Sequence, residues 1–233
     1  MESIEASIIG TIIEKPRPFK VGEERFYLYP VTLGKHYLIS LYVGSIGMDM
    51  DNIRINPYME ALRLCKEKRD VVCRILAYHT LDKREELYDE GIVQERSDFL
   101  SGNVDDENLA QLFVIVMASD DVDVMMKRFG IDKETEWKNK ALRAKKSNNS
   151  LSFGGKSVYG TLIDTACQRY GWTMRQVLWE ISYANLQMLL ADSVTSIYLT
   201  DEELKSVHIP KERDVINADD PANRARIKAM RWD

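Results

Sequence analysis

The chain has 233 residues, of which 45% are hydrophobic and 30% are charged, and its formal net charge at pH 7 is -5. This length and apolar content allow a sizeable buried core and argue against an intrinsically disordered chain. The mixed, slightly acidic charge argues against a protein built mainly to hold nucleic acid.

The N-terminus carries acids, Glu2 and Glu5, where a secretory signal would carry a basic region. No apolar run reaches the roughly 20 residues that a membrane-spanning helix needs. We therefore expect a cytoplasmic protein that does not engage a membrane. The cysteines Cys65, Cys73 and Cys167 sit among apolar neighbours, which predicts buried, reduced thiols.

Residues 1–30 predict an N-terminal extended or β segment. The β-branched run at 4–13 is typical of a short strand or edge extension, and residues 26–29 form a second extended piece that is closed by Pro30.

Residues 31–146 predict a helical body. Helical spacing begins after Thr32, which is a candidate cap. A second helical pattern of about two dozen residues starts at Asn56-Pro57, because proline suits the first helical position. Asp105 and Asp132 are further candidate caps. Additional helices are expected at 83–90, 105–118, 121–129 and 133–146.

The polar stretch 147–156 breaks the helical pattern and predicts an internal boundary. Residues 151–199 then predict a C-terminal helical region with an aromatic cluster, and 200–233 a charged tail with one short helix near 221–230. Within that region, Gly171 should end a helix over 157–170. Thr173 and Gln176 have capping-box spacing, and a wide apolar face follows over 177–197. The fold class expected is mainly α, a helical bundle with a short N-terminal β element.

Several local patterns resemble catalytic or ligand sites without meeting their requirements. The run from Gly154 to Ser157 ends as phosphate loops do, but it lacks the upstream glycine and the buried strand, so a glycine hinge into a helix cap explains it better. The histidines and cysteines are not at metal-ligand spacing. The acidic cluster Asp120, Asp121 and Asp123 lacks the pattern of a calcium loop. We expect no enzyme, cofactor or metal.

The basic stretch 138–146 is interpreted as a solvated helix surface. Its cations do not share one helical face, and aromatic residues are not interleaved with them as a nucleic-acid surface would require.

The aromatic residues of the C-terminal region are the most informative feature. Large aromatics with a polar end build cores, and they also anchor protein interfaces. We divide them about evenly between these two roles and assign Trp172 more to the core. The candidate partner-binding residues are Tyr159, Tyr170, Trp172, Trp179, Tyr183, Leu186 and Met188.

Eight short blocks between residues 26 and 200 form a recognisable set: Tyr29-Pro30-Val31-Thr32-Leu33-Gly34-Lys35, Ala77-Tyr78-His79-Thr80, Phe153-Gly154-Gly155-Lys156-Ser157, Tyr159-Gly160-Thr161-Leu162-Ile163-Asp164, Tyr170-Gly171-Trp172, Ile181-Ser182-Tyr183, Asn185-Leu186 and Ala191-Asp192. Together these blocks resemble tail assembly chaperones of long-tailed bacteriophages, in the version found in phages and prophages of gut Bacteroidales. Where that family has a small residue after the second tryptophan, this chain has Glu180.

The resemblance implies a non-catalytic, helical viral protein of the host cytoplasm that binds the tape-measure protein, and possibly tail-tube subunits, during tail assembly. Physically this would be helix-in-groove binding, for which the ten methionines offer adaptable apolar contacts. The alternative is a structural virion component of the neck or tail, such as a connector or tail-completion protein. Such a component would stay in the finished particle, whereas a chaperone would leave it.

Overall fold

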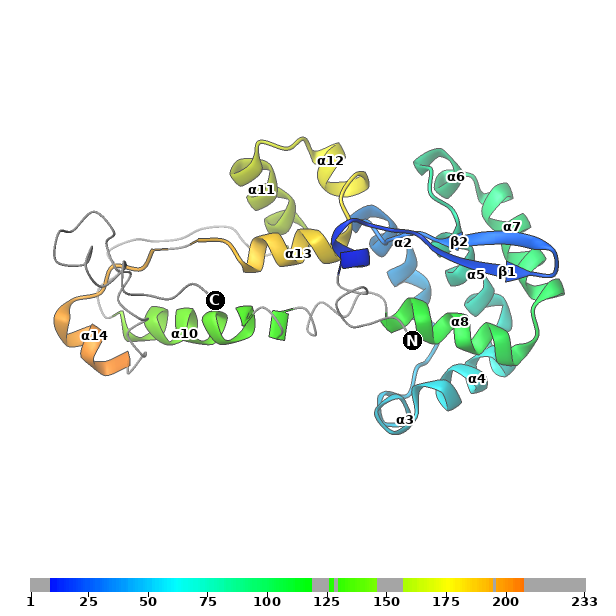
Figure 1. The fold of residues 1–233 in the computed structure, drawn as a ribbon, viewed down its shortest axis with the longest axis horizontal. Coiled ribbons are helices and arrows are strands. Elements are labelled where there is room, and N and C mark those ends of the chain that lie inside the picture. Colours follow the sequence, from blue (N-terminus) through cyan, green and yellow to red (C-terminus); the bar gives the residue numbers. More distant parts are fainter. Residues whose placement is uncertain (1–8, 119–125, 128–129, 146–156, 195, 208–233) are drawn as a thin grey trace, which may run out of the picture. The chain divides into compact units, whose positions relative to one another are not determined.

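The computed structural model of the chain describes residues 9–118, 126–127, 130–145, 157–194 and 196–207 (Figure 1). The fold is mainly α with a short antiparallel sheet near the N-terminus, as the sequence predicts. The described residues fall into two compact units. The first unit comprises the described residues within 9–132 and 157–194, and the second unit comprises the described residues within 133–145 and 196–207. No helix within these ranges is long and apolar enough to cross a membrane.

The N-terminal sheet is a hairpin of β1 (Arg17–Val21) and β2 (Glu24–Leu28), in which Arg17 pairs with Leu28. Gly22 lies in the turn with φ of +59°, a conformation that suits glycine. The extended piece expected at 26–29 is therefore confirmed for the most part. The strand expected at 4–13 is wrong for its described residues, because 9–12 form a helical turn.

The helical body begins with α2 (Leu33–Val43), and Thr32 caps it through a bond from the Lys35 N–H, as predicted. The short helix α3 (Met50–Ile55), which the pattern did not predict, follows it. The predicted start at Asn56-Pro57 is also confirmed, with the Asn56 side chain accepting two backbone N–H groups. The pattern beyond it divides at Lys68 into α4 (Pro57–Glu67) and α5 (Arg69–Thr80).

Three further helices complete the body: α6 (Arg84–Tyr88), α7 (Glu90–Asn103) and α8 (Asp106–Ala118). Asp105 accepts a bond from the Asn108 N–H, so its predicted capping role is confirmed. The central helix is α5, which contacts α7, α8, α2 and β2. Its face carries the fully buried residues Val72, Cys73, Ile75 and Leu76 of the main core.

The C-terminal region supplies α11 (Val158–Tyr170), α12 (Met174–Trp179) and α13 (Tyr183–Ala191), which belong to the first unit together with the body. The apolar face predicted over 177–197 is interrupted at residues 180–182, so it forms two helices and not one.

The second unit contains most of α10 (Ile131–Ala144) and α14 (Asp201–Val207). The prediction that Asp132 caps a helix is wrong, because α10 begins one residue earlier and Asp132 lies inside it. A helix at 201–207 was not predicted for the charged tail. The helix expected near 221–230 lies outside the described residues, as does most of the one expected at 121–129.

Candidate partner-binding surface

The surface is built on α11, α12 and α13, whose ends are fixed by local side chains. Ser157 caps α11, and Gly171, with φ of +66°, ends it in the left-handed conformation. Thr173 and Gln176 form the predicted capping box of α12. Ser182 then caps α13 by accepting the Asn185 N–H. These caps explain why three short helices form here and turn back on one another (Figure 1).

A small apolar core lies beneath the three helices. Leu186 is fully buried in this core, which also contains Ala166, Val177 and Leu33 of α2. Leu186 therefore stabilises the cluster from inside and presents no surface to a partner in this structure. Around this core the other aromatic residues of α11 and α13 remain partly exposed.

Tyr170 and Trp172 are half-buried and pack against this core. Their rings stack at 4.7 Å between centroids, and the Tyr170 hydroxyl donates to the Leu189 carbonyl oxygen at 2.8 Å. Beside them an open depression of about 470 Å³ is lined in part by Tyr170, Met188, Leu189 and Val194. Val194 is 86% exposed, so the depression has an uncovered apolar rim.

Two other candidate tyrosines reach α2. Tyr159 meets Tyr37 edge to face at 5.8 Å, and Tyr37 is itself 54% exposed. Tyr183 stacks on His36 at 4.4 Å, and burial lowers the pKa of that histidine, which favours a neutral imidazole. These two contacts join the aromatic cluster to the helical body.

Trp179 lies apart from the other aromatic candidates. Its indole covers Gly34, where an added Cβ would be 2.6 Å from the ring. Tyr88 of α6 meets the indole edge to face at 5.4 Å, and the Arg84 guanidinium lies 5.8 Å from its centroid. Trp179 therefore packs on the body, and only a side chain as small as glycine fits beneath it.

The backbone also connects this region to distant segments. The Tyr183 N–H donates to the Val31 carbonyl at 2.7 Å. The Glu14 carboxylate accepts from the Ser182 N–H at 2.7 Å and from the Asn185 side chain at 2.9 Å. An anion at the start of α13 also complements the helix dipole. Two N-terminal segments, one containing Glu14 and the other Val31, therefore hold the start of α13.

A second apolar opening, which the sequence reasoning missed, lies between α3, α4 and α8. It has a volume of about 280 Å³, and its lining is almost wholly apolar. Met50 and Met117 are 58% and 42% exposed at its edge. The high methionine content was the available signal, but it did not indicate which methionines meet. The residues at the opening are Met48, Met50, Ile53, Pro57, Glu60, Ala61, Leu64, Phe113, Val114 and Met117.

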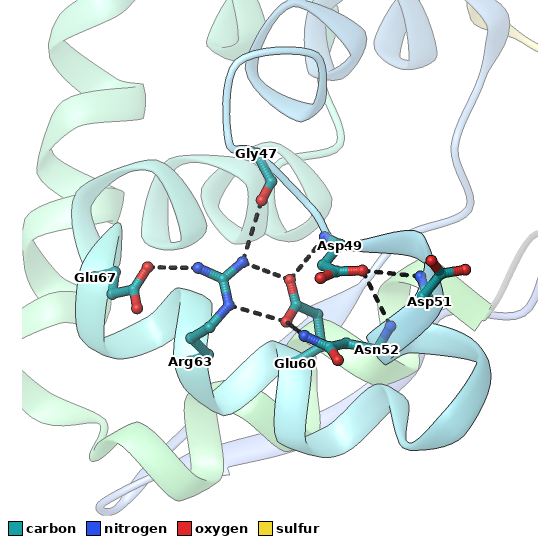
Figure 2. A network of polar contacts seen from close by, with 7 residues as sticks. All are labelled: Gly47, Asp49, Asp51, Asn52, Glu60, Arg63 and Glu67. Carbon is teal, nitrogen blue, oxygen red and sulfur yellow. Dashed lines mark hydrogen bonds and ion pairs between the residues drawn. The ribbon is translucent and has the colours of Figure 1, made fainter.

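A polar network centred on Glu60 fixes one wall of this opening (Figure 2). The buried Glu60 carboxylate accepts from Arg63 at 2.6 and 2.9 Å, from the Asp49 N–H at 2.9 Å and from Asn52 at 3.4 Å. The bonds from Arg63, followed by that from the Asp49 N–H, lower the pKa of Glu60 to about 2 against the opposing effect of burial.

The same network holds the chain just before α3. The Arg63 guanidinium donates to the Gly47 carbonyl at 3.1 Å and also pairs with Glu67 of its own helix. Asp49 in turn caps α3 through the N–H groups of Asp51 and Asn52. Glu60 and Arg63 therefore hold the start of α3 against α4 (Figure 2). Met50, the first residue of α3, is positioned at the edge of the opening in this way.

No family model, curated protein or solved structure matches the chain.

Among the residues that the structure describes, the remaining sequence candidates have local structural roles. Cys65 and Cys73 are buried thiols, and burial raises the pKa of Cys65 to about 12. Within the described part of the chain, no three His, Cys, Asp or Glu side chains are grouped to hold a metal ion. Ser157 caps a helix, as expected. Residues 154–156, the acidic cluster at 120–123 and His208 lie outside the described residues.

Proposed function

We propose that this protein is a tail assembly chaperone of the long-tailed phage type, which binds an amphipathic helix of the tape-measure protein and performs no chemistry of its own. The depression beside Tyr170 and Met188 is the proposed docking surface. It would receive the apolar side chains of the incoming helix, which recur at three- and four-residue spacing.

The observation that carries the proposal is the convergence of the segments that resemble this family. Tyr29–Lys35, Ala77–Thr80 and Ile181–Tyr183 are far apart in the sequence, yet backbone hydrogen bonds link them. The Tyr29 N–H donates to the His79 carbonyl at 2.8 Å, and the Tyr183 N–H donates to the Val31 carbonyl. The resemblance therefore falls on segments that together support the aromatic helices, and not on scattered surface positions.

The chemistry of the surface suits a helical partner. Met188 is unbranched and polarisable, and it can adapt to helix turns of different shape. The aromatic pair Tyr170 and Trp172 offers a large, stiff contact area with little loss of side-chain entropy. Such a surface can shield successive apolar turns of a long helix, which is what a tape-measure chaperone has to do.

The test is copurification of the full chain with a tape-measure fragment from the same phage, compared across two matched variants. Val194→Glu places a charge at the rim of the depression and should reduce recovery of the fragment at least tenfold, because a buried unpaired charge is costly. Val158→Glu makes the same change at a valine that is 77% exposed on α11 and should leave recovery unchanged.

Equal recovery by both variants would remove the depression as the docking surface. Failure of the unaltered chain to retain the fragment would remove the proposed function. Presence of the protein in purified virions at the stoichiometry of a tail component would favour the alternative of a structural neck or tail protein.

A further inference from the structure

The proposed docking depression contains charged side chains as well as apolar ones. Arg169 in the last turn of α11 and Asp192 at the end of α13 line it together with Met188, Leu189 and Val194. Both charged residues are exposed. A helix that covers the apolar part of the depression must therefore also meet one positive and one negative charge.

Neither charge has a counter-ion among the residues that the structure describes. Arg169 and Asp192 do not pair with each other, and neither side chain makes an ion pair or a hydrogen bond within that part of the chain. The Arg169 guanidinium lies 5.9 Å from the centroid of the Tyr170 ring, a contact that uses none of its N–H donors. Both charges are thus available to a partner.

The position of Asp192 is unfavourable for folding. Its backbone N–H donates to the Met188 carbonyl at 2.9 Å as the cap of α13. The C-terminal end of a helix carries a partial negative charge, which repels a carboxylate, and the last turn of α13 has no basic residue to offset this repulsion. Arg169 differs, because a cation in the last turn of α11 complements the dipole of that helix. The stability of the free chain therefore accounts for Arg169 but not for Asp192.

On the basis of the proposed function, we infer that the tape-measure helix presents a lysine or arginine to Asp192 and an acidic residue to Arg169, beside the apolar stripe that enters the depression. Opposite charges at the rim of an interface fix the register of the partner and disfavour wrong partners more than they add affinity. Asp192 and Arg169 select helical segments that carry one base and one acid beside the stripe, and they reject segments whose charges are all of one sign.

The experiment is a calorimetric titration of the full chain with a tape-measure fragment from the same phage. Asp192→Asn removes the charge and keeps the shape of the side chain, and it should weaken binding about threefold, as the loss of a rim ion pair does. Asp192→Lys places a like charge against the base of the fragment and should weaken binding about tenfold. The control Glu95→Gln changes an exposed acid of α7 that does not line the depression, and it should bind as the unaltered chain does.

The stability of the free chain gives a second readout that a purely structural role of Asp192 would not produce. Asp192→Asn should raise the midpoint of urea unfolding, because it removes an anion from the C-terminal end of α13, while it lowers the affinity for the fragment. Added salt should weaken fragment binding by the unaltered chain more than binding by Asp192→Asn, since salt screens the ion pair that this variant lacks. For the cation, Arg169→Gln should weaken binding about threefold, whereas Arg25→Gln on β2 should not.

The outcomes separate this inference from the proposed function. If the unaltered chain binds the fragment and Asp192→Lys binds it equally well, the charge pairing is overturned while the proposed function stands. If Asp192→Asn lowers the urea midpoint together with the affinity, Asp192 serves folding and the inference is again overturned. If the unaltered chain does not bind the fragment, the proposed function and the inference fail together.

Discussion

Replacement of Glu60 by glutamine should destabilise the first unit, because it removes a charge that several donors surround. Breaking a buried ion pair costs about 3–5 kcal/mol. Here the Arg63 side chain is 35% exposed, so water can replace part of the lost contact, and we expect a loss of about 2 kcal/mol for Glu60→Gln. The matched control is Glu67→Gln, which removes the other partner of Arg63. Glu67 is 54% exposed, and the expected loss is about 0.5 kcal/mol or less.

The assay is urea unfolding followed by far-ultraviolet circular dichroism over a range of pH. The folded pKa of Glu60 lies below its ordinary value of 4.5, so its stabilising effect is complete above about pH 4.5 and declines as the pH falls toward 2. The difference between the unaltered chain and Glu60→Gln should therefore be constant near neutral pH and shrink in acid. Equal effects of Glu60→Gln and Glu67→Gln, or a difference that does not change in acid, would refute the reasoning.

Two further predictions concern packing and thiol reactivity. Gly34→Ala should lower the free energy of unfolding in urea by about 1–3 kcal/mol, because the new Cβ would lie 2.6 Å from the Trp179 ring. The control Gly102→Ala has open space at its Cβ and should not lower it. Equal effects of the two substitutions would contradict the packing described for Trp179. In the folded chain a thiol reagent should react quickly with the partly exposed Cys167 and slowly with the buried Cys65 and Cys73, and all three should react after unfolding. Rapid reaction that persists in a Cys167→Ser variant would contradict the burial of the other two.

The sequence predicted best the elements whose ends are set by neighbouring residues. Thr32, Asn56-Pro57, Gly171 and the Thr173–Gln176 pair all act locally, because each satisfies backbone groups within one helical turn. The resulting expectation of a mainly helical fold is confirmed.

The sequence failed where distant residues decide the local structure. The break between α12 and α13 is held by Glu14 and Val31, more than a hundred residues upstream, and no local pattern contains them. The helix α7 was missed because Gly91, Ser97 and Gly102 obscure its apolar periodicity, although Val93 and Leu100 are fully buried.

The candidate site was predicted only in part, because some of its contacts are local in the sequence and others join distant segments. Tyr170 and Trp172 are neighbours across the Gly171 cap, so their association follows from the sequence. Trp179 was grouped with them by proximity, yet it packs over Gly34, a contact that depends on tertiary structure. The methionines between α3, α4 and α8 come from segments that are separated by more than fifty residues, and periodicity alone could not bring them together.

The most direct measurement of the central claim is amide hydrogen exchange of the full chain with and without a tape-measure fragment. Binding at the proposed surface should slow exchange across α11 and α13, around Tyr170 and Met188, and leave α7 unchanged. Slowed exchange confined to other helices, or no change at a saturating concentration of the fragment, would contradict the account.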